Sequence, residues 1–151
     1  MSSTSSAAER LLSLFRRLRK LGFEQNPLQD NSITMPQLTL LEWVAETPGC
    51  GIQEIADGLD LSAPTVSVGI RRLEEAGLLE RRPDPEDGRA VQLFLTIQGR
   101  RLHERARAFR RKKMQSLLEG LTPAERRTLL DLLERAVVSA EKREKDHREV
   151  T

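Results

Sequence analysis

Apolar side chains recur every three or four residues over long stretches of the chain, which predicts amphipathic helices. The first stretch covers about residues 6–24, and Gly22 and Pro27 are its end signals. Its apolar positions are Leu11, Leu14, Phe15, Leu18 and Leu21. The polar residues that follow, 25–33, are typical of a loop. The chain therefore opens with one long helix and a connection.

Three helices are predicted next. Thr34 can cap the first and form a capping box with Gln37. Residues 52–59 have the pattern of a short helix, and after a tight turn Ser62 can cap a third helix that Gly77 ends. The positions of this third helix that share the core-facing side are Val66, Ile70 and Leu73.

Residues 78–82 and 89–96 are predicted to be strands, the second because polar and apolar residues alternate along it. The charged sequence PDPEDG separates them, which predicts a β-hairpin with a long tip.

Two further helices are expected at the C-terminal end. Thr96 can cap the first, which runs to about residue 119, and Thr122 with Glu125 marks the start of a helix to about residue 145. The residues of this last helix expected to face inward are Leu129, Leu132, Leu133, Ala136 and Ala140. The predicted fold class is mostly α with a small β-hairpin.

The composition of the chain excludes some classes of function. Aromatic residues make up only 3% of the chain, too few for a surface that stacks single-stranded nucleic acid. The net charge is only +2, although residues 98–113 carry eight Arg or Lys against one Glu, a run that we interpret as a solvated helix face. One cysteine, no apolar run of membrane-spanning length and no signal-peptide pattern favour a soluble cytoplasmic protein.

A helix-turn-helix over residues 52–76 is the feature that points to a function. With Val66, Ile70 and Leu73 inward, the opposite face of the second helix carries small, uncharged side chains and then arginines. A helix that enters the major groove N-terminus first needs slim first turns. Ser and Thr can bond to several bases, and Val68 can contact a thymine methyl group. The DNA-contacting candidates on this helix are Ser62, Pro64, Thr65, Ser67, Val68, Arg71 and Arg72.

The hairpin next to this helix completes a winged helix-turn-helix. Its tip carries Arg89, which can enter a narrow minor groove. Asp87 lies two residues earlier and is expected to hold the arginine side chain extended. We therefore add Asp87 and Arg89 to the DNA-contacting candidates.

The chain resembles the multiple antibiotic resistance regulator (MarR) family of bacterial and archaeal transcription factors in two stretches, ITMPQLTLLEWVAE and IQEIADGLDLSAPTVSVGIRRLEEAGLLERRPDPEDGRAVQLFLTIQGR, and the likeness covers residues 33–100. It implies one domain over residues 1–151, with a winged-helix lobe at about 33–98. It further implies that helices at about 6–24 and 98–146 hold a homodimer on pseudo-palindromic promoter DNA. Repression is the commoner behaviour in that family, and small-molecule effectors often release its members from DNA.

Three positions depart from the family pattern. Ala63 stands where a Lys is common, and Val68 followed by Gly69 stands where an Arg often occurs. Asp60 replaces a common Gly in the tight turn, and Asp tolerates a left-handed backbone better than most residues. Base contacts are therefore expected to be weaker or more hydrophobic than in similar proteins.

Other residues of the chain suggest further functions less strongly. Phe15 and Trp43 are candidates for an effector pocket, although such residues are more often core. Cys50 is interpreted as a structural residue rather than a redox switch, and His103 and His147 have no partner spacing for a metal. No catalytic or cofactor motif is present, so we expect neither an enzyme nor a cofactor. The alternative is a winged helix that binds another protein, which would expose Leu or aromatic anchors.

Overall fold

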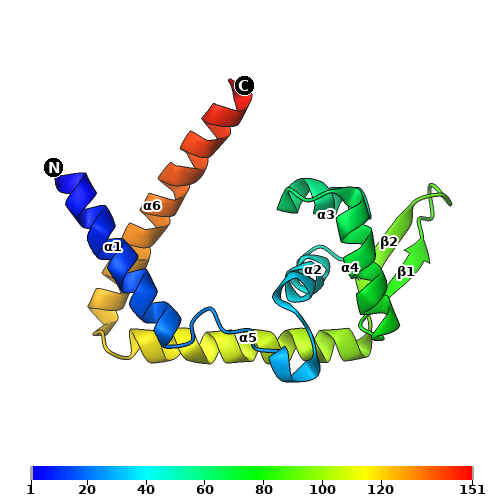
Figure 1. Ribbon diagram of the computed structural model, residues 1–151, viewed down its shortest axis with the longest axis horizontal. Helices are drawn as coiled ribbons and strands as arrows, with labels where there is room; N and C mark the ends of the chain where they lie inside the picture. The colour runs from blue at the N-terminus through cyan, green and yellow to red at the C-terminus, as the bar shows by residue number, and fades with distance from the viewer. Residues whose placement is uncertain (1, 151) are drawn as a thin grey trace. The chain divides into compact units, whose positions relative to one another are not determined.

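The computed structural model describes residues 2–150. The chain divides between Arg111 and Lys112 into two compact units. The helices are α1 (Ser3–Lys20), α2 (Met35–Glu46), α3 (Ile52–Leu59), α4 (Ala63–Glu75), α5 (Ile97–Leu118) and α6 (Pro123–Glu149), with a short 3-10 turn at Gln29–Asn31. The strands are β1 (Leu79–Pro83) and β2 (Val91–Leu95) (Figure 1). The predicted fold class, mostly α with a small β-hairpin, is confirmed.

Helix α1 begins and ends about three residues earlier than predicted. Ser2 caps it by accepting a hydrogen bond from the Ser5 N–H at 3.2 Å. At the other end Gly22 has φ = +84°, a left-handed conformation that stops the helix. The apolar periodicity placed the helix correctly, but the two caps set its limits.

The core lies in the first unit, between α2, α3, α4 and the hairpin (Figure 1). Its side chains with no exposed surface include the predicted Val66 and Ile70 of α4. They also include Leu28, in the stretch predicted to be a polar loop. The Asn26 side chain folds this segment, because it accepts from the Leu28 N–H at 3.0 Å and donates to the Ile33 carbonyl at 2.6 Å. A single leucine has no periodicity, so the sequence did not signal its burial.

Two predicted local features orient the helices of the lobe. The capping box of α2 is present, with the Thr34 N–H donating to Gln37 Oε1 at 3.0 Å and the Gln37 N–H to Thr34 Oγ1 at 3.3 Å. Asp60, between α3 and α4, has φ = +55°, as its tolerance of the left-handed region allows. Helix α3 also lies very close to α2, since a Cβ on Gly58 would stand 2.0 Å from the Trp43 ring.

The hairpin is antiparallel, with Leu79 opposite Leu95 and Pro83 opposite Val91. Leu93 and Leu95 of β2 face the core, as the alternation predicted. On the other side, the Arg82 guanidinium lies 4.2 Å from the centroid of the Phe94 ring. Strand β1 has the predicted length but begins one residue later, and β2 is three residues shorter than predicted.

Helix α5 is fixed to the rest of its unit as far as Arg110. Thr96 caps it, with the Gly99 N–H donating to Thr96 Oγ1 at 3.0 Å. Further along, Arg105 forms an ion pair with Asp30 at 3.7 Å, and Arg110 forms one with Glu42 of α2. The lobe therefore continues into this long helix without a flexible joint at its start.

Helix α6 has the predicted capping box, with the Thr122 N–H donating to Glu125 Oε1 at 2.9 Å. This contact lowers the pKa of the Glu125 carboxyl. The prediction that its leucines face inward is wrong for the single chain. Leu132 is 53% exposed and Leu133 48%, and no described residue of α6 is buried. Over residues 2–150 this apolar face is exposed.

No helix formed by residues 2–150 is both long enough and apolar enough to span a membrane.

Candidate nucleic-acid interface

Helix α4 separates its two faces as predicted. Val66, Ile70 and Leu73 are buried, while Thr65, Val68 and Arg72 are exposed on the other side. The predicted residues Ser62, Pro64 and Arg71 are also exposed, and Ser67 is half-buried. The structure thus brings all seven candidates of this helix onto its outer surface and its N-terminal end.

The hydroxyl groups at the start of α4 are bonded to each other. Ser62 Oγ accepts from the Thr65 N–H at 3.2 Å, as an N-cap does, and it also lies 2.7 Å from Thr65 Oγ1. Each hydroxyl therefore spends part of its bonding capacity within the helix start. The sequence predicted the cap but not the pairing of the two side chains.

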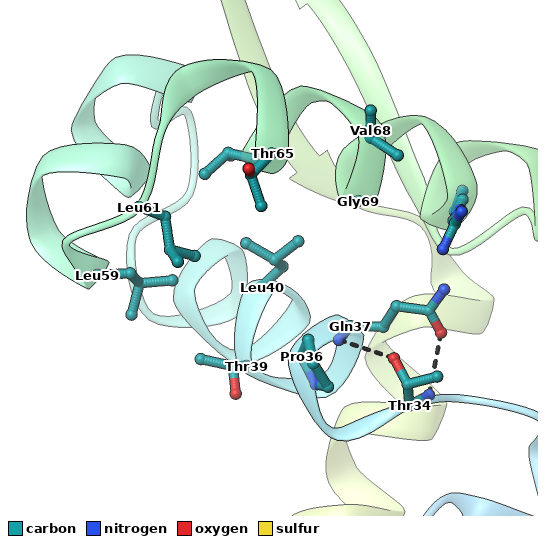
Figure 2. A pocket seen from close by; sticks show the side chains of 12 residues that line it. Thr34, Pro36, Gln37, Thr39, Leu40, Leu59, Leu61, Thr65, Val68 and Gly69 are labelled. Carbon is teal, nitrogen blue, oxygen red and sulfur yellow. Dashed lines mark hydrogen bonds between the residues drawn. The ribbon is translucent and has the colours of Figure 1, made fainter.

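A groove of about 840 Å³ runs beside the outer face of α4 (Figure 2). The N-terminal turns of α2 form one side, and the turn before α4 together with α4 itself forms the other. Its lining residues are Thr34, Pro36, Gln37, Thr39, Leu40, Leu59, Leu61, Thr65, Val66, Val68, Gly69 and Arg72. Arg72 is the one charged residue among them, and none is acidic.

Gly69 explains how α2 and α4 come so close. A Cβ at this position would lie 2.4 Å from Leu40 Cδ1, so a side chain would displace the leucine at the base of the groove. Gly69, which follows the departure at Val68, thus lets the Leu40 side chain keep its place against α4. Of the residues that line the groove, the sequence predicts three as site residues: Thr65, Val68 and Arg72. The α2 residues were missed because no sequence signal pairs two helices side by side.

The cations of the outer face are available for a ligand. Neither Arg71 nor Arg72 forms an ion pair within the described part of the chain. By contrast, Arg81 of β1 is paired with Glu74 at 2.5 Å, and Arg82 is paired with Glu80. Positive charge is therefore concentrated one turn after the uncharged start of α4.

The wing tip differs from its prediction in one contact. Asp87 Oδ1 accepts from the backbone N–H of Arg89 at 3.0 Å, and no ion pair joins its carboxylate to the Arg89 guanidinium over residues 2–150. Asp87 thus shapes the turn through this backbone contact and does not hold the arginine side chain extended. Arg89 itself is exposed at the tip.

The other candidate residues lie away from this face. Cys50 is 2% exposed, and burial raises the pKa of its thiol, with the nearby Glu54 charge adding to the effect. Trp43 is packed on Gly58, and Phe15 is 51% exposed on α1. Neither aromatic side chain lines the groove beside α4.

Comparison with known proteins gives a consistent result. The MarR family model matches residues 33–91. The HTH-type transcriptional repressor Rv2887 of Mycobacterium tuberculosis is 29% identical over 103 residues, which cover 68% of this chain and 74% of the relative. The uncharacterized HTH-type transcriptional regulator YsmB of Bacillus subtilis is 30% identical over 98 residues, covering 65% and 67%.

Among solved structures, a mutant of MepR from S. aureus bound to an oligodeoxyribonucleotide is 26% identical to this chain. Its TM-score is 0.62, and the match covers 92% of this chain and 99% of MepR. The relatives are transcription regulators and not enzymes, as the sequence predicted.

Proposed function

The chain belongs to the MarR family of transcriptional regulators, and from that premise we propose that it is a homodimer that binds specific promoter DNA. The observation that carries the proposal is the outer face of α4. This face is slim and uncharged at its N-terminal end and carries two unpaired arginines one turn later. Such a face fits the major groove of double-stranded DNA.

In the proposed complex α4 lies in the major groove with Ser62, Thr65 and Val68 nearest the bases. Arg71 and Arg72 reach phosphates or a guanine, and Arg89 at the wing tip enters the adjacent minor groove. The MepR mutant bound to an oligodeoxyribonucleotide supports this role by its similarity, since both chains have the same fold.

The homodimer is proposed from the uncovered apolar faces of α1 and α6. Leu11 and Phe15 of α1 are about half exposed, and so are Leu132 and Leu133 of α6. Monomeric proteins seldom expose apolar surfaces of this kind, and a second copy of the chain would bury them. Two copies present two α4 helices, which fit half-sites roughly 10 base pairs apart on a pseudo-palindrome.

Repression of transcription, in the cytoplasm, is the proposed outcome of binding. It rests on relatives named as repressors, such as Rv2887. Release by a small-molecule effector rests on the family resemblance, and Phe15 and Trp43 stay its predicted residues.

The test is binding of the purified chain to the DNA beside its own gene, followed by fluorescence anisotropy. We expect tight binding that survives an excess of random competitor DNA and weakens steeply with salt. Binding that the competitor abolishes would contradict a sequence-specific function.

A further inference from the structure

The apolar surface of the lobe is concentrated where DNA would lie. Between residues 33 and 96, the exposed large hydrophobic side chains are Met35 at 39%, Leu61 at 45% and Val68 at 47%. Two of them, Leu61 and Val68, line the groove beside α4 (Figure 2). Exposed apolar side chains that gather at one place commonly mark a binding surface.

These two side chains belong to one stripe along the groove, formed by Leu61, Thr65, Val68 and Arg72. The spacings of four, three and four residues put them on the same side of the helix and of the turn before it. The stripe is uncharged from Leu61 to Val68, with a methyl-bearing side chain at each of its three positions, and it is cationic at Arg72. No acidic side chain lines the groove, so its charge suits a polyanion.

The uncharged polar groups along the stripe are partly occupied within the protein. Thr65 Oγ1 lies 2.7 Å from Ser62 Oγ, which also accepts the Thr65 N–H. Gln37, across the groove, uses its side-chain oxygen in the capping box of α2. A base edge that approaches the first turns of α4 therefore meets methyl groups more readily than free hydrogen-bonding groups.

From this arrangement we infer that the stripe recognises the 5-methyl groups of thymines, with Thr65 contributing its methyl group rather than its hydroxyl. The occupant of the apolar part is a thymine methyl in the major groove, where that group is the distinguishing apolar feature of a base pair. Arg72 then lies toward a phosphate or a guanine farther along the site. The inference rests on the proposed function, and it names the chemistry by which that function selects its DNA.

The experiment starts from duplexes that the full-length protein selects from a random-sequence pool. Each thymine of a selected half-site is replaced in turn by uracil, which keeps the base pairing and removes only the methyl group. Burial of one methyl group corresponds to about a fourfold change in affinity, so uracil at a contacted position should weaken binding by about that factor. Uracil at positions outside the contact should have no effect.

Variants assign the lost contact to the stripe. In Val68→Ala the affinity ratio of thymine to uracil should fall toward one at one position, as a double-mutant cycle requires for a direct contact. Thr65→Ser, which keeps the hydroxyl, should lose more affinity than Thr65→Val, which keeps the methyl group.

The outcomes separate the two proposals. Selected duplexes that bind equally well with uracil at every position, or a greater loss in Thr65→Val than in Thr65→Ser, would overturn the inference and leave the regulator function standing. A pool that yields no preferred sequence would overturn both.

Discussion

The winged-helix lobe and the long helix α6 differ in how far their apolar side chains are buried. In α4, Val66 and Ile70 have no exposed surface, because α2, α3 and the hairpin surround them. In α6, Leu132 and Val137 keep 53% and 54% of their surface exposed, although the helix is more than twice as long. The lobe buries its core within one chain, whereas the apolar face of α6 stays exposed in it.

Charge on the uncovered face of α6 is the change expected to have the largest effect. The double variant Leu132→Asp with Leu133→Asp would bury four carboxylates in a homodimer, and an unpaired buried charge costs several kcal/mol. We expect the dimer dissociation constant to rise by more than about a hundredfold. Sedimentation velocity measures this change.

Arg127→Asp is the matched control, because it makes the same change in net charge on the opposite side of α6 from these two leucines. It should leave the dimer intact. Equal dissociation in both variants, or an unaltered dimer in the double variant, would contradict the assignment of this face to a second copy.

A change inside the lobe tests its tighter packing. In Gly58→Ala the new methyl group would stand 2.0 Å from the Trp43 ring, so the ring or the helix has to shift. Overpacking should lower the free energy of unfolding by about 2 kcal/mol, despite the better helix propensity of alanine. Urea unfolding measures it, and Gly88→Ala is the control, since nothing lies within 4 Å of its added Cβ. Equal stability of the two variants would show that the contact between α2 and α3 is loose.

Arg89→Ala tests DNA affinity without changing the packing of the lobe or the apolar face of α6. We expect binding to weaken severalfold, about 1 kcal/mol, and the salt dependence to decrease by about one ion for each arginine lost. Arg82→Ala is the matched wing variant, because Arg82 is already paired with Glu80 and stacked on Phe94. A larger loss in Arg82→Ala than in Arg89→Ala would place the DNA contact at the base of the wing instead of its tip.

The smallest effect is expected at Cys50. Burial raises the pKa of its thiol, so the folded protein holds little of the reactive thiolate. A thiol reagent should react with Cys50 only as fast as the lobe opens, and peroxide should leave DNA binding unchanged, as should Cys50→Ser. Rapid labelling of the folded protein, or a peroxide response lost in Cys50→Ser, would make Cys50 a sensor.

The same pKa shift has a consequence for stability. Because the thiol ionises more easily in the unfolded chain, its burial favours folding less as the pH rises above the ordinary value of about 9. The free energy of unfolding should therefore decrease there in the wild type, and less so in Cys50→Ser.

The lobe was largely predictable because its signals are local. The Thr34–Gln37 capping box, the inward face of α4 and the alternation in β2 each depend on residues within a few positions. The burial of Leu28 was not predicted, because it depends on two side-chain hydrogen bonds of Asn26. No sequence pattern indicates these two bonds. The seven α4 candidates lie on its outer surface, but their contacts with DNA stay a prediction.

The groove beside α4 depends on contacts between distant parts of the chain. It exists because Gly69 lets Leu40 approach, two residues that are far apart in sequence. The contact of Asp87 and the pairing of Ser62 with Thr65 depend on side-chain rotamers, which a sequence does not specify. For α6, the periodicity predicts that one face is apolar. It does not say whether that face packs against the same chain or against another molecule.

A footprint of the protein on its promoter duplex tests the central claim most directly. Dimethyl sulfate reports guanine N7 in the major groove, and hydroxyl radicals report the sugars that line the minor groove. The account predicts two protected major-groove segments about one helical turn apart in inverted orientation, each with minor-groove protection where a wing lies. Protection of a single segment, or of none, would contradict a dimer that presents two α4 helices to DNA.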